Sequence, residues 1–312
     1  MITRRTLLHA SLAAAASAAF LGSGRARASA GQTAIASQPL NGGLWLISGA
    51  GGNVVAAGGN DGLLLVDGGA PGRTADLLKR LAQETGGHHV STLFNTHWHW
   101  DHTGGNEALA KAGATIIAHE NTRLWLTEPV ISKWEQRTYP PLPKSAWPKQ
   151  TFFDSAPHAM SFGNSKLEYG HLGQAHTDGD IYVFFPDANV LAAGDVVSGG
   201  SYPLADYCSN GWLGGMIQGL KTLMARCDAQ TRVIPGSGPL RTKADLSAQL
   251  DLCFEVLTKI ADSYYKGQTW EELLASAPTK AFDAKWGNPD LFLKTAYAGA
   301  WLHINEIRRV TK

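Results

Sequence analysis

The sequence predicts a single mixed α/β domain over residues 31–312 with a helical C-terminal end. Three observations predict this fold class: short apolar runs separated by glycines, a histidine-rich loop directly after one such run, and long stretches of helical apolar spacing beyond residue 213. The hydrophobic fraction of 44% and the charged fraction of 17% are ordinary for a globular protein. A chain of 312 residues can bury a sizeable core without disulfides.

The first half of the domain reads as strands with helices between them. Apolar runs predict strands at Gly43–Ser48, Asn53–Ala57, Gly62–Asp67, Val90–Phe94 and 114–119. Apolar residues three and four positions apart predict a helix at Arg73–Glu84, and a shorter helix is expected at Asn106–Ala112.

The second half begins after an irregular stretch at Glu128–Phe152, where five prolines stand among aromatic residues. Long irregular stretches inside a domain are uncommon and often functional. Strands are expected beyond it at Ser165–Tyr169, Ile181–Phe185 and Val190–Ala193. Helices are expected at Gly214–Cys227, Lys243–Tyr265, Trp270–Ala275 and Pro289–Val310.

Residues 1–30 differ from the rest of the chain. They have a basic start, an alanine-rich apolar middle and a small-residue end at Ala28–Ala30, which is the pattern of a cleaved export signal. Arg4 and Arg5 precede a leucine pair, as in a twin-arginine signal. The apolar run is shorter than the ~20 residues that span a bilayer. We therefore expect an exported, periplasmic protein with no membrane contact beyond export.

Charge and cysteine content narrow the expected partners. Without the four arginines of residues 1–30 the chain carries a net charge of −3, which does not favour nucleic acid or an anionic membrane as a partner. We expect a small-molecule substrate instead, and the sequence does not indicate an oligomeric state. Cys208, Cys227 and Cys253 allow one disulfide at most, so no cysteine framework holds the fold.

The segment NTHWHWDHTGGN, residues 95–106, crowds metal-binding side chains into one loop. In an extended segment His97 and His99 would point the same way and could address one ion. Asp101 and His102 would then suit a second ion close by. Imidazole and carboxylate ligands fit zinc, manganese or iron better than calcium or magnesium.

The spacing H-x-H-x-D-H of this segment resembles the signature of the metallo-β-lactamase superfamily. Asp67, at the end of LLLVDGG, is similar to a family aspartate that lies below the site and is usually structural. The blocks GQAHTDGD and NVLAAGDVV resemble those that supply a third histidine and a bridging carboxylate, here His176 and Asp195. The resemblance implies a four-layered αββα sandwich with metal at one edge between two sheets.

The resemblance also implies the ligands. It implies a first metal site made by His97, His99 and His176, and a second made by Asp101, His102 and a bridging Asp195. The last family ligand should be a histidine in a PGHG-like turn, but this chain reads VIPGSGP and places Ser237 there. Serine is a poor neutral ligand for zinc, so one or two ions remain possible. His158, His171 and His303 are the unplaced histidines that could substitute.

These ligands predict a zinc-dependent hydrolase that acts on a lactam, lactone, ester or thioester. Metal-activated water would attack the carbonyl, and Asp101 would orient the water or carry its proton. β-Lactamases that have a cysteine ligand at the position of Asp195 also carry a lysine three residues later, which binds the carboxylate of the antibiotic. In this chain Ser198 stands at the position of that lysine, and Asp195 is typical of the broader hydrolase branch. Two alternatives stay open: a mononuclear iron oxygenase that resembles persulfide dioxygenases and uses His97, His176 and Asp195, and a non-catalytic binding relative.

Five further residues are candidates for the surroundings of the site. Asp180 could fix a ligand histidine by a hydrogen bond. Aromatic residues in irregular segments either line a pocket over the metal or pack the loops onto the core; these are Tyr139, Trp147, Tyr202 and Trp212.

Overall fold

The computed structural model describes residues 33–59 and 62–311. Contacts divide the chain into two units, Met1–Thr33 and Ala34–Lys312, and the second unit holds every element named below. The export signal expected at residues 1–30 lies outside the described residues. Within the described ranges, no helix is both long and apolar enough to cross a membrane.

Seven strands form the first sheet, in the order β1-β2-β3-β4-β5-β6-β9. Their bounds are β1 (Ala36–Pro39), β2 (Leu44–Ser48), β3 (Val54–Gly59), β4 (Gly62–Val66), β5 (Val90–Phe94), β6 (Thr115–His119) and β9 (Gln150–Phe152). The strands β2 to β4 correspond to three predicted strands and form an antiparallel meander, which β1, not predicted, extends at its edge, whereas β4, β5, β6 and β9 run parallel. Parallel neighbours need crossovers, and α2 (Thr74–Thr85) and α4 (Asn106–Lys111) lie in the first two of them.

Five strands form the second sheet, in the order β10-β11-β12-β13-β14. Their bounds are β10 (His158–Phe162), β11 (Ser165–His171), β12 (Ile181–Phe185), β13 (Val190–Gly194) and β14 (Arg232–Pro235). The first four strands are antiparallel, and β14 runs parallel to β13 after a crossover through α6 (Leu213–Met224).

Side chains that alternate along each strand build the apolar layers. In β4, Leu64 faces the second sheet and shares an apolar cluster with Phe185 of β12. Its neighbours Leu63 and Leu65 face the other way and cluster with Leu77 of α2. One strand therefore contributes both to the layer between the sheets and to the layer beneath the helices.

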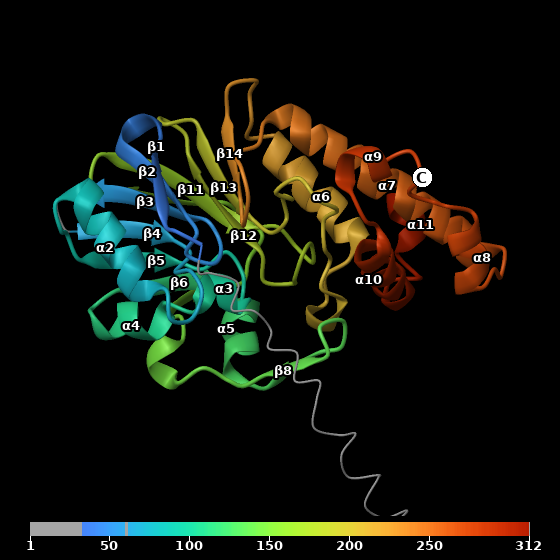
Figure 1. The fold of residues 1–312 in the computed structure, drawn as a ribbon, viewed down its shortest axis with the longest axis horizontal. Helices are drawn as coiled ribbons and strands as arrows, with labels where there is room; N and C mark the ends of the chain where they lie inside the picture. The colour runs from blue at the N-terminus through green and yellow to red at the C-terminus, as the bar shows by residue number, and fades with distance from the viewer. Residues whose placement is uncertain (1–32, 60–61, 312) are drawn as a thin grey trace, which may run out of the picture. The chain divides into compact units, whose positions relative to one another are not determined.

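The outer face of the second sheet is covered by helices in the same way. Leu191 of β13 clusters with Ile217 of α6, Val256 of α7 (Lys243–Tyr265) and Ala296 of α10 (Asp290–Leu302). Figure 1 shows α2 and α4 on one side of the paired sheets and α6, α7 and α10 on the other. The predicted four-layered αββα sandwich is confirmed.

The helical C-terminal end is confirmed too, with one correction. The helices α7 and α8 (Trp270–Ala275) have the predicted bounds, and a short α9 (Asp283–Trp286) follows. The single helix expected at Pro289–Val310 is wrong, because α10 ends at Leu302 and turns separate it from α11 (Ile307–Val310). The turn contains His303 and Asn305, which are weaker helix formers than the alanines and leucines of α10.

The irregular stretch holds little regular structure of its own. After α5 (Glu120–Thr127) come a short hairpin of β7 (Val130–Ser132) and β8 (Arg137–Tyr139), and a 3-10 turn at Lys144–Ala146. Buried side chains of α5, β7 and β8 form a small cluster with one residue of the histidine-rich loop; they are Leu126, Val130, Tyr139 and Trp98. The hairpin is thereby packed beside that loop.

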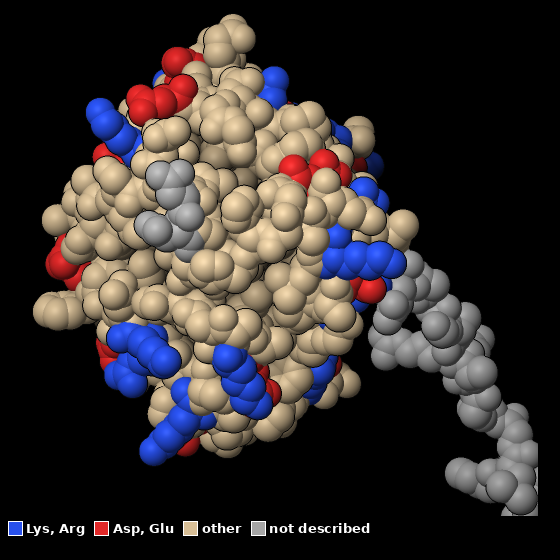
Figure 2. Space-filling view, turned by 90° about the vertical axis from the view of Figure 1, so that its left-hand side faces the viewer, with Lys and Arg blue, Asp and Glu red and all other residues tan. Residues whose placement is uncertain are grey.

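The structure also bears on charge and on the cysteines. Figure 2 shows the side on which α2 and α4 lie, where charged side chains of both signs stand around a mostly neutral centre. This face therefore offers no continuous basic surface.

Cys208, Cys227 and Cys253 are all unpaired.

Candidate metal centre

The loop after β5 carries four of the predicted ligands, and its two ends are tied together. Asn95 and Asn106 exchange two side-chain hydrogen bonds, with amide nitrogen to oxygen distances of 3.0 and 2.8 Å. Between them the chain bends and then forms one helical turn, α3 (Trp100–Thr103). The predicted extended conformation is wrong here: the segment bends at residues 96–98, and the helical turn that follows places the ring of His102 4.4 Å from the ring of His97, measured between centroids.

A second loop packs directly behind this segment. A Cβ atom on Gly104 would lie 2.1 Å from the nitrogen of Pro71, and one on Gly105 would lie 2.4 Å from the carbonyl oxygen of Gly68. Only glycine allows the loop after β4 to approach so closely. That loop begins with Asp67, which is thereby placed under the histidines.

Asp67 fixes the orientation of two histidines. Its Oδ2 lies 2.8 Å from Nδ1 of His102 and accepts a 2.7 Å bond from the hydroxyl of Thr96, while its Oδ1 accepts from the Thr96 amide at 2.8 Å. The Thr96 hydroxyl in turn lies 3.1 Å from Nδ1 of His97. With Nδ1 donating in both histidines, each Nε2 carries a lone pair. Asp67 therefore sets the tautomers of both histidines from below the site.

His99 and His176 are held in complementary tautomers. Nε2 of His99 donates to Oδ2 of Asp206 at 3.1 Å, and Nδ1 of His176 donates to the carbonyl of Leu204 at 2.8 Å. Their remaining nitrogens, Nδ1 of His99 and Nε2 of His176, face each other at 3.0 Å. Two lone pairs at this distance repel unless a proton or a metal ion lies against them. Because Asp206 and Leu204 fix these tautomers, a proton or a cation is needed beside the two facing nitrogens.

The first group of ligand atoms is compact. One ligand atom from each of His97, His99, His176 and Asp195 lies within 4.8 Å of the others. The Oδ2 atom of Asp195 is 3.8 Å from Nε2 of His97 and 3.7 Å from Nε2 of His176. Burial holds the pKa of His97 well below its usual range, so its Nε2 stays neutral and able to bind a metal.

A second group lies on the other side of Asp195. Nε2 of His102 is 3.7 Å from Oδ1 of Asp195 and 3.6 Å from Oδ2 of Asp101. Burial lowers the pKa of His102, but Asp101, Asp67 and Asp195 together raise it to about 10 when no ion is bound, so a metal ion would bind Nε2 by displacing its proton. Nε2 of His97 and Nε2 of His102 are both buried without a hydrogen-bond partner. Such orphaned nitrogens are costly unless an ion binds them, so the residues present fit a zinc-type ion in each group.

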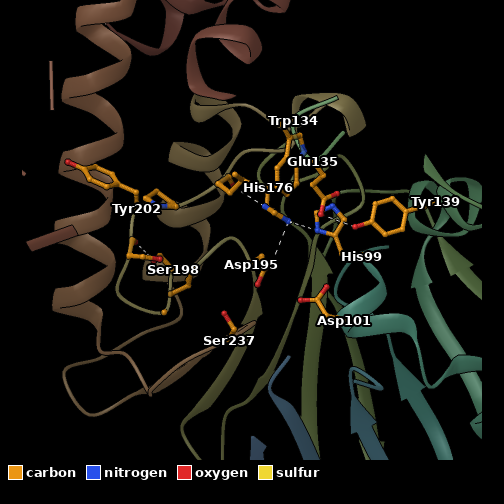
Figure 3. Close-up of a pocket in the computed structure, with 15 residues that line it drawn as sticks. His99, Asp101, Trp134, Glu135, Tyr139, His176, Asp195, Ser198, Tyr202 and Ser237 are labelled. Carbon is orange, nitrogen blue, oxygen red and sulfur yellow. Dashed lines mark hydrogen bonds and ion pairs between the residues drawn. The ribbon is translucent and has the colours of Figure 1, made fainter. Parts of the chain in front are cut away.

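The turn at residues 235–238, which has Ser237 where the family has a histidine, lies beside the second group. A Cβ atom on Gly236 would lie 1.9 Å from Oδ1 of Asp195 and 2.9 Å from Cε1 of His102. The buried Asn53 holds this turn, since its side-chain amide donates to the carbonyls of Pro235 and Gly238, each at 2.9 Å. Ser237 lines the cavity next to Asp195 (Figure 3).

None of the three unplaced histidines replaces the missing ligand. His158 stacks on Tyr169, and His171 stacks on His119. His303 stacks on Trp212 with ring centroids 4.4 Å apart. All three are engaged away from the two groups, so the second group consists of His102, Asp101 and Asp195 with Ser237 nearby.

The two groups open into a cavity of about 250 Å³. Figure 3 shows Trp134 and Glu135 on one side of it, Tyr139 beyond His99, and Tyr202 and Ser198 on the opposite side. The residues that line it are His99, Asp101, Trp134, Glu135, Tyr139, His176, Asp195, Val197, Ser198, Gly199, Ser201, Tyr202, Pro203, Leu204 and Ser237. Asp101 has the most exposed carboxylate of the two groups, at 51%.

Three of the surrounding candidates do not line the cavity. Trp147 packs against the small apolar cluster of the hairpin, and its indole donates to the carbonyl of Leu142 at 2.8 Å. Trp212 is buried in the helical layer, so neither tryptophan lines the cavity. Asp180 does not bond a histidine side chain. It accepts from the amide and the hydroxyl of Thr177, each at 2.8 Å, and so holds the turn that follows His176.

Asp206 is a central residue of the site that no pattern in the sequence indicates. Its Oδ2 binds His99 and accepts from the Ser209 hydroxyl at 2.7 Å, and its Oδ1 accepts from the indole of Trp134 at 2.8 Å. Burial raises the pKa of Asp206, but the hydrogen bond and charge of His99 outweigh this and lower it to about 2. Asp206 is 107 positions from His99, and only tertiary structure brings them together. Asn53, Trp134 and Glu135 were missed for the same reason.

We expect Asp206→Asn to weaken zinc binding about tenfold, the lower end of the effect of removing a group that orients a metal-bound histidine. The amide would compete for the positions of the donors around it, and His99 would lose the acceptor that fixes its tautomer. Titration against a chromophoric chelator measures the affinity. Asp262→Asn, on an exposed part of α7, is the matched control. Unchanged affinity in Asp206→Asn would show that His99 is held without the carboxylate.

Comparison with known proteins adds sequence and fold relatives. The family model described as the metallo-beta-lactamase superfamily matches residues 48–250. The chain is 25% identical over 191 residues to a type 2 metallo-beta-lactamase of Bacillus sp. (strain 170), covering 61% of this chain and 68% of the relative. It is also 25% identical over 185 residues to the alpha subunit of a 2,4-dinitroanisole O-demethylase of Nocardioides sp. (strain JS1661), covering 58% and 53% of the two chains.

A solved structure supports the same fold. A metallo-beta-lactamase from Pontibacter korlensis superposes with a TM-score of 0.56 at 20% sequence identity. The match covers 70% of this chain and 98% of that one. At this identity the likeness establishes the arrangement of the sandwich and not the reaction.

Proposed function

Because the chain belongs to the metallo-β-lactamase superfamily, we propose that it is a zinc-dependent hydrolase of carbonyl substrates. The observation that carries the proposal is the pair of buried, unpartnered Nε2 atoms of His97 and His102, which lie on either side of Asp195. A chain that had lost its catalytic role would have little reason to keep both nitrogens without a partner, because each is costly to bury.

The residues divide into holding and reacting roles. His97, His99, His176 and Asp195 would hold a zinc ion, which when bound lowers the pKa of water to near neutral and polarises a carbonyl. Asp101 lies beside them at the open cavity. Burial raises its pKa, but the charges of His102 and His99 lower it overall, so Asp101 is ionised at neutral pH. It can therefore accept the proton of the attacking water and pass it to the leaving group.

The proposed substrate is a small molecule with a lactam, lactone, ester or thioester group. The cavity of about 250 Å³ fits a small compound next to the two groups. Ser198, which stands where β-lactamases with a cysteine ligand have a lysine, lines this cavity. The names of the relatives, a lactamase and an O-demethylase, illustrate how widely substrates differ among similar chains.

We further propose that the protein works in the periplasm after removal of residues 1–30. The basic, alanine-rich start of the sequence motivates this proposal. N-terminal sequencing of the protein recovered from a bacterial periplasm tests it. A mature chain that begins near Gly31 supports export, and an intact Met1 in the cytoplasm contradicts it.

The first experiment is the metal content per chain of mature protein purified without chelator, together with hydrolysis of a chromogenic ester. We expect zinc, loss of hydrolysis on chelation, and recovery on addition of zinc. Iron with oxygen uptake on a persulfide would favour the oxygenase instead. A protein without bound metal that also fails to take up zinc would contradict the hydrolase.

The number of ions should respond to Ser237. We expect the first group to fill before the second, because the second has fewer protein ligands and a neutral serine where the family has a histidine. Ser237→His should raise the zinc content at limiting supply from about one to about two ions per chain, since tetrahedral zinc sites use up to four protein ligands. Ser237→Ala is the matched control. Equal zinc content in both variants would show that residue 237 does not reach the ion.

A further inference from the structure

The charge of the cavity wall is one-sided. Three carboxylates line the cavity, those of Asp101, Glu135 and Asp195. No lysine or arginine is found among the described residues that line it. Asp101 and Asp195 belong to the two metal groups, where bound ions would neutralise them. Glu135 belongs to neither group, so a bound ion would not neutralise its charge, and the substrate would be exposed to that charge.

The neighbouring cations are engaged elsewhere. The guanidinium of Arg137 lies over the ring of Tyr139, 4.4 Å from its centroid, and is not part of the cavity wall. Arg241 lines a separate cavity beyond Ser198, to whose carbonyl its Nε donates at 3.2 Å. Lys133 lines a third, apolar groove. None of these side chains offers a partner for an anionic substrate within the cavity.

Glu135 is held in position by its own hairpin. The hydroxyl of Tyr139 donates to Oε1 of Glu135 at 2.9 Å, and no other described side chain bonds this carboxylate. The preceding residue, Trp134, is anchored through its indole to Asp206. The carboxylate therefore stands at the cavity in a defined place, which lowers the entropy cost of using it for recognition.

Aromatic residues line the cavity beside Glu135. Trp134 and Tyr139 lie on the same side as Glu135, whereas Tyr202 lies across the cavity with its ring turned away (Figure 3). A carboxylate beside aromatic rings is the environment that binds an alkylammonium group, through charge attraction and cation–π contact. Glu135 repels a carboxylate group placed beside it, where no lysine or arginine lines the wall.

We propose that the cavity selects substrates that carry an alkylammonium group on the arm next to Glu135 and rejects those that carry a carboxylate there. This inference rests on the proposed hydrolase function where it concerns rates of hydrolysis. It predicts that anionic compounds, including β-lactams with their carboxylate, are poor substrates. Glu135 is the residue that makes the distinction, and Tyr139 positions it.

Three esters of matched shape test the proposal. They are 4-nitrophenyl esters whose acyl chains end in a trimethylammonium group, in the isosteric tert-butyl group, or in a carboxylate, with a second set that carries these groups on the alcohol. We expect kcat/KM for the cation to exceed that for the neutral isostere about tenfold, the sum expected from one ion pair and cation–π contact. Glu135→Gln should reduce this ratio to about two, while zinc content stays unchanged.

Glu128→Gln removes the same charge just before β7, outside the cavity, and should keep the tenfold ratio. A ratio near one in the wild-type protein, a preference for the carboxylate ester, or an unchanged ratio in Glu135→Gln would each overturn the proposal. Preference for the carboxylate would direct attention to Arg241 beyond the Ser198 loop.

A binding measurement separates this inference from the hydrolase proposal. Choline and its neutral isostere 3,3-dimethylbutan-1-ol are titrated into the protein with the fluorescence of tryptophan as the signal, with wild type, Glu135→Gln and Tyr139→Phe compared. Tighter binding of choline that depends on Glu135 supports the inference even if no ester is hydrolysed. Equal binding of both alcohols overturns it even if all esters are hydrolysed.

Discussion

Asp195→Asn is expected to remove most of the bound metal and to lower kcat/KM by about a thousandfold or more. The carboxylate is the one ligand shared by both groups, with Oδ2 facing His97 and His176 and Oδ1 facing His102. An amide of the same shape removes the negative charge from both sites at once. Metal ions contribute several kcal/mol to such reactions, and about 4 kcal/mol corresponds to a thousandfold in rate.

Metal analysis and ester hydrolysis measure the two effects in parallel. Asp187→Asn, in the exposed turn between β12 and β13, is the matched control and should retain both properties. A melting temperature close to that of wild-type apoprotein would show that Asp195→Asn still folds. Retention of metal together with activity within tenfold of wild type would contradict the central place given to Asp195.

Asp67→Asn is expected to lower the affinity for the second ion and the activity by about a hundredfold. The residue has a φ of 67°, in the left-handed region, which asparagine tolerates as well as aspartate. The substitution therefore adds no backbone strain. It does offer a donor where Thr96 and His102 both need an acceptor, so His102 would adopt the tautomer with hydrogen on Nε2.

The same substitution should reduce the free energy of unfolding by about 1–3 kcal/mol, because a buried donor loses its partner. Chemical denaturation of the metal-free proteins measures this effect apart from metal binding. Asp251→Asn on the exposed face of α7 serves as the control. If Asp67→Asn binds two ions with wild-type affinity, the tautomer of His102 is set by another group.

Much of the sandwich could be predicted because its strands carry their own signal. Strand β12 (IYVFF) has the predicted bounds, since a strand buried on both faces needs apolar residues throughout, and β5 (VSTLF) has them because β-branched and aromatic residues favour strands. Strand β10 (HAMSF) was missed because polar side chains interrupt it, and β14 has only four residues and ends in a proline. Helix α5 was missed because it is short and lies next to the irregular stretch.

The site divides in the same way between local and distant information. The spacing of His97, His99, Asp101 and His102 is visible in a single loop, and the structure brings these residues together with His176 and Asp195. The sequence does not reveal the groups that orient these ligands. Asp206 contacts His99 because its own backbone amide donates to the carbonyl of His176. No local sequence pattern predicts that contact.

The ligands come from both halves of the sandwich, and this has a consequence for the lifetime of the protein. His97 and His99 follow a strand of the first sheet, whereas His176 and Asp195 lie next to strands of the second. An ion bound by all four would act as a crosslink between sheets that are otherwise joined by their shared apolar layer and by a few hydrogen bonds, such as that from Asn53 to the carbonyl of Pro235. The free energy of ion binding then adds to that of folding. Resistance to heat and to proteases would follow the zinc supply of the compartment, so a starved cell would lose the protein as well as its activity.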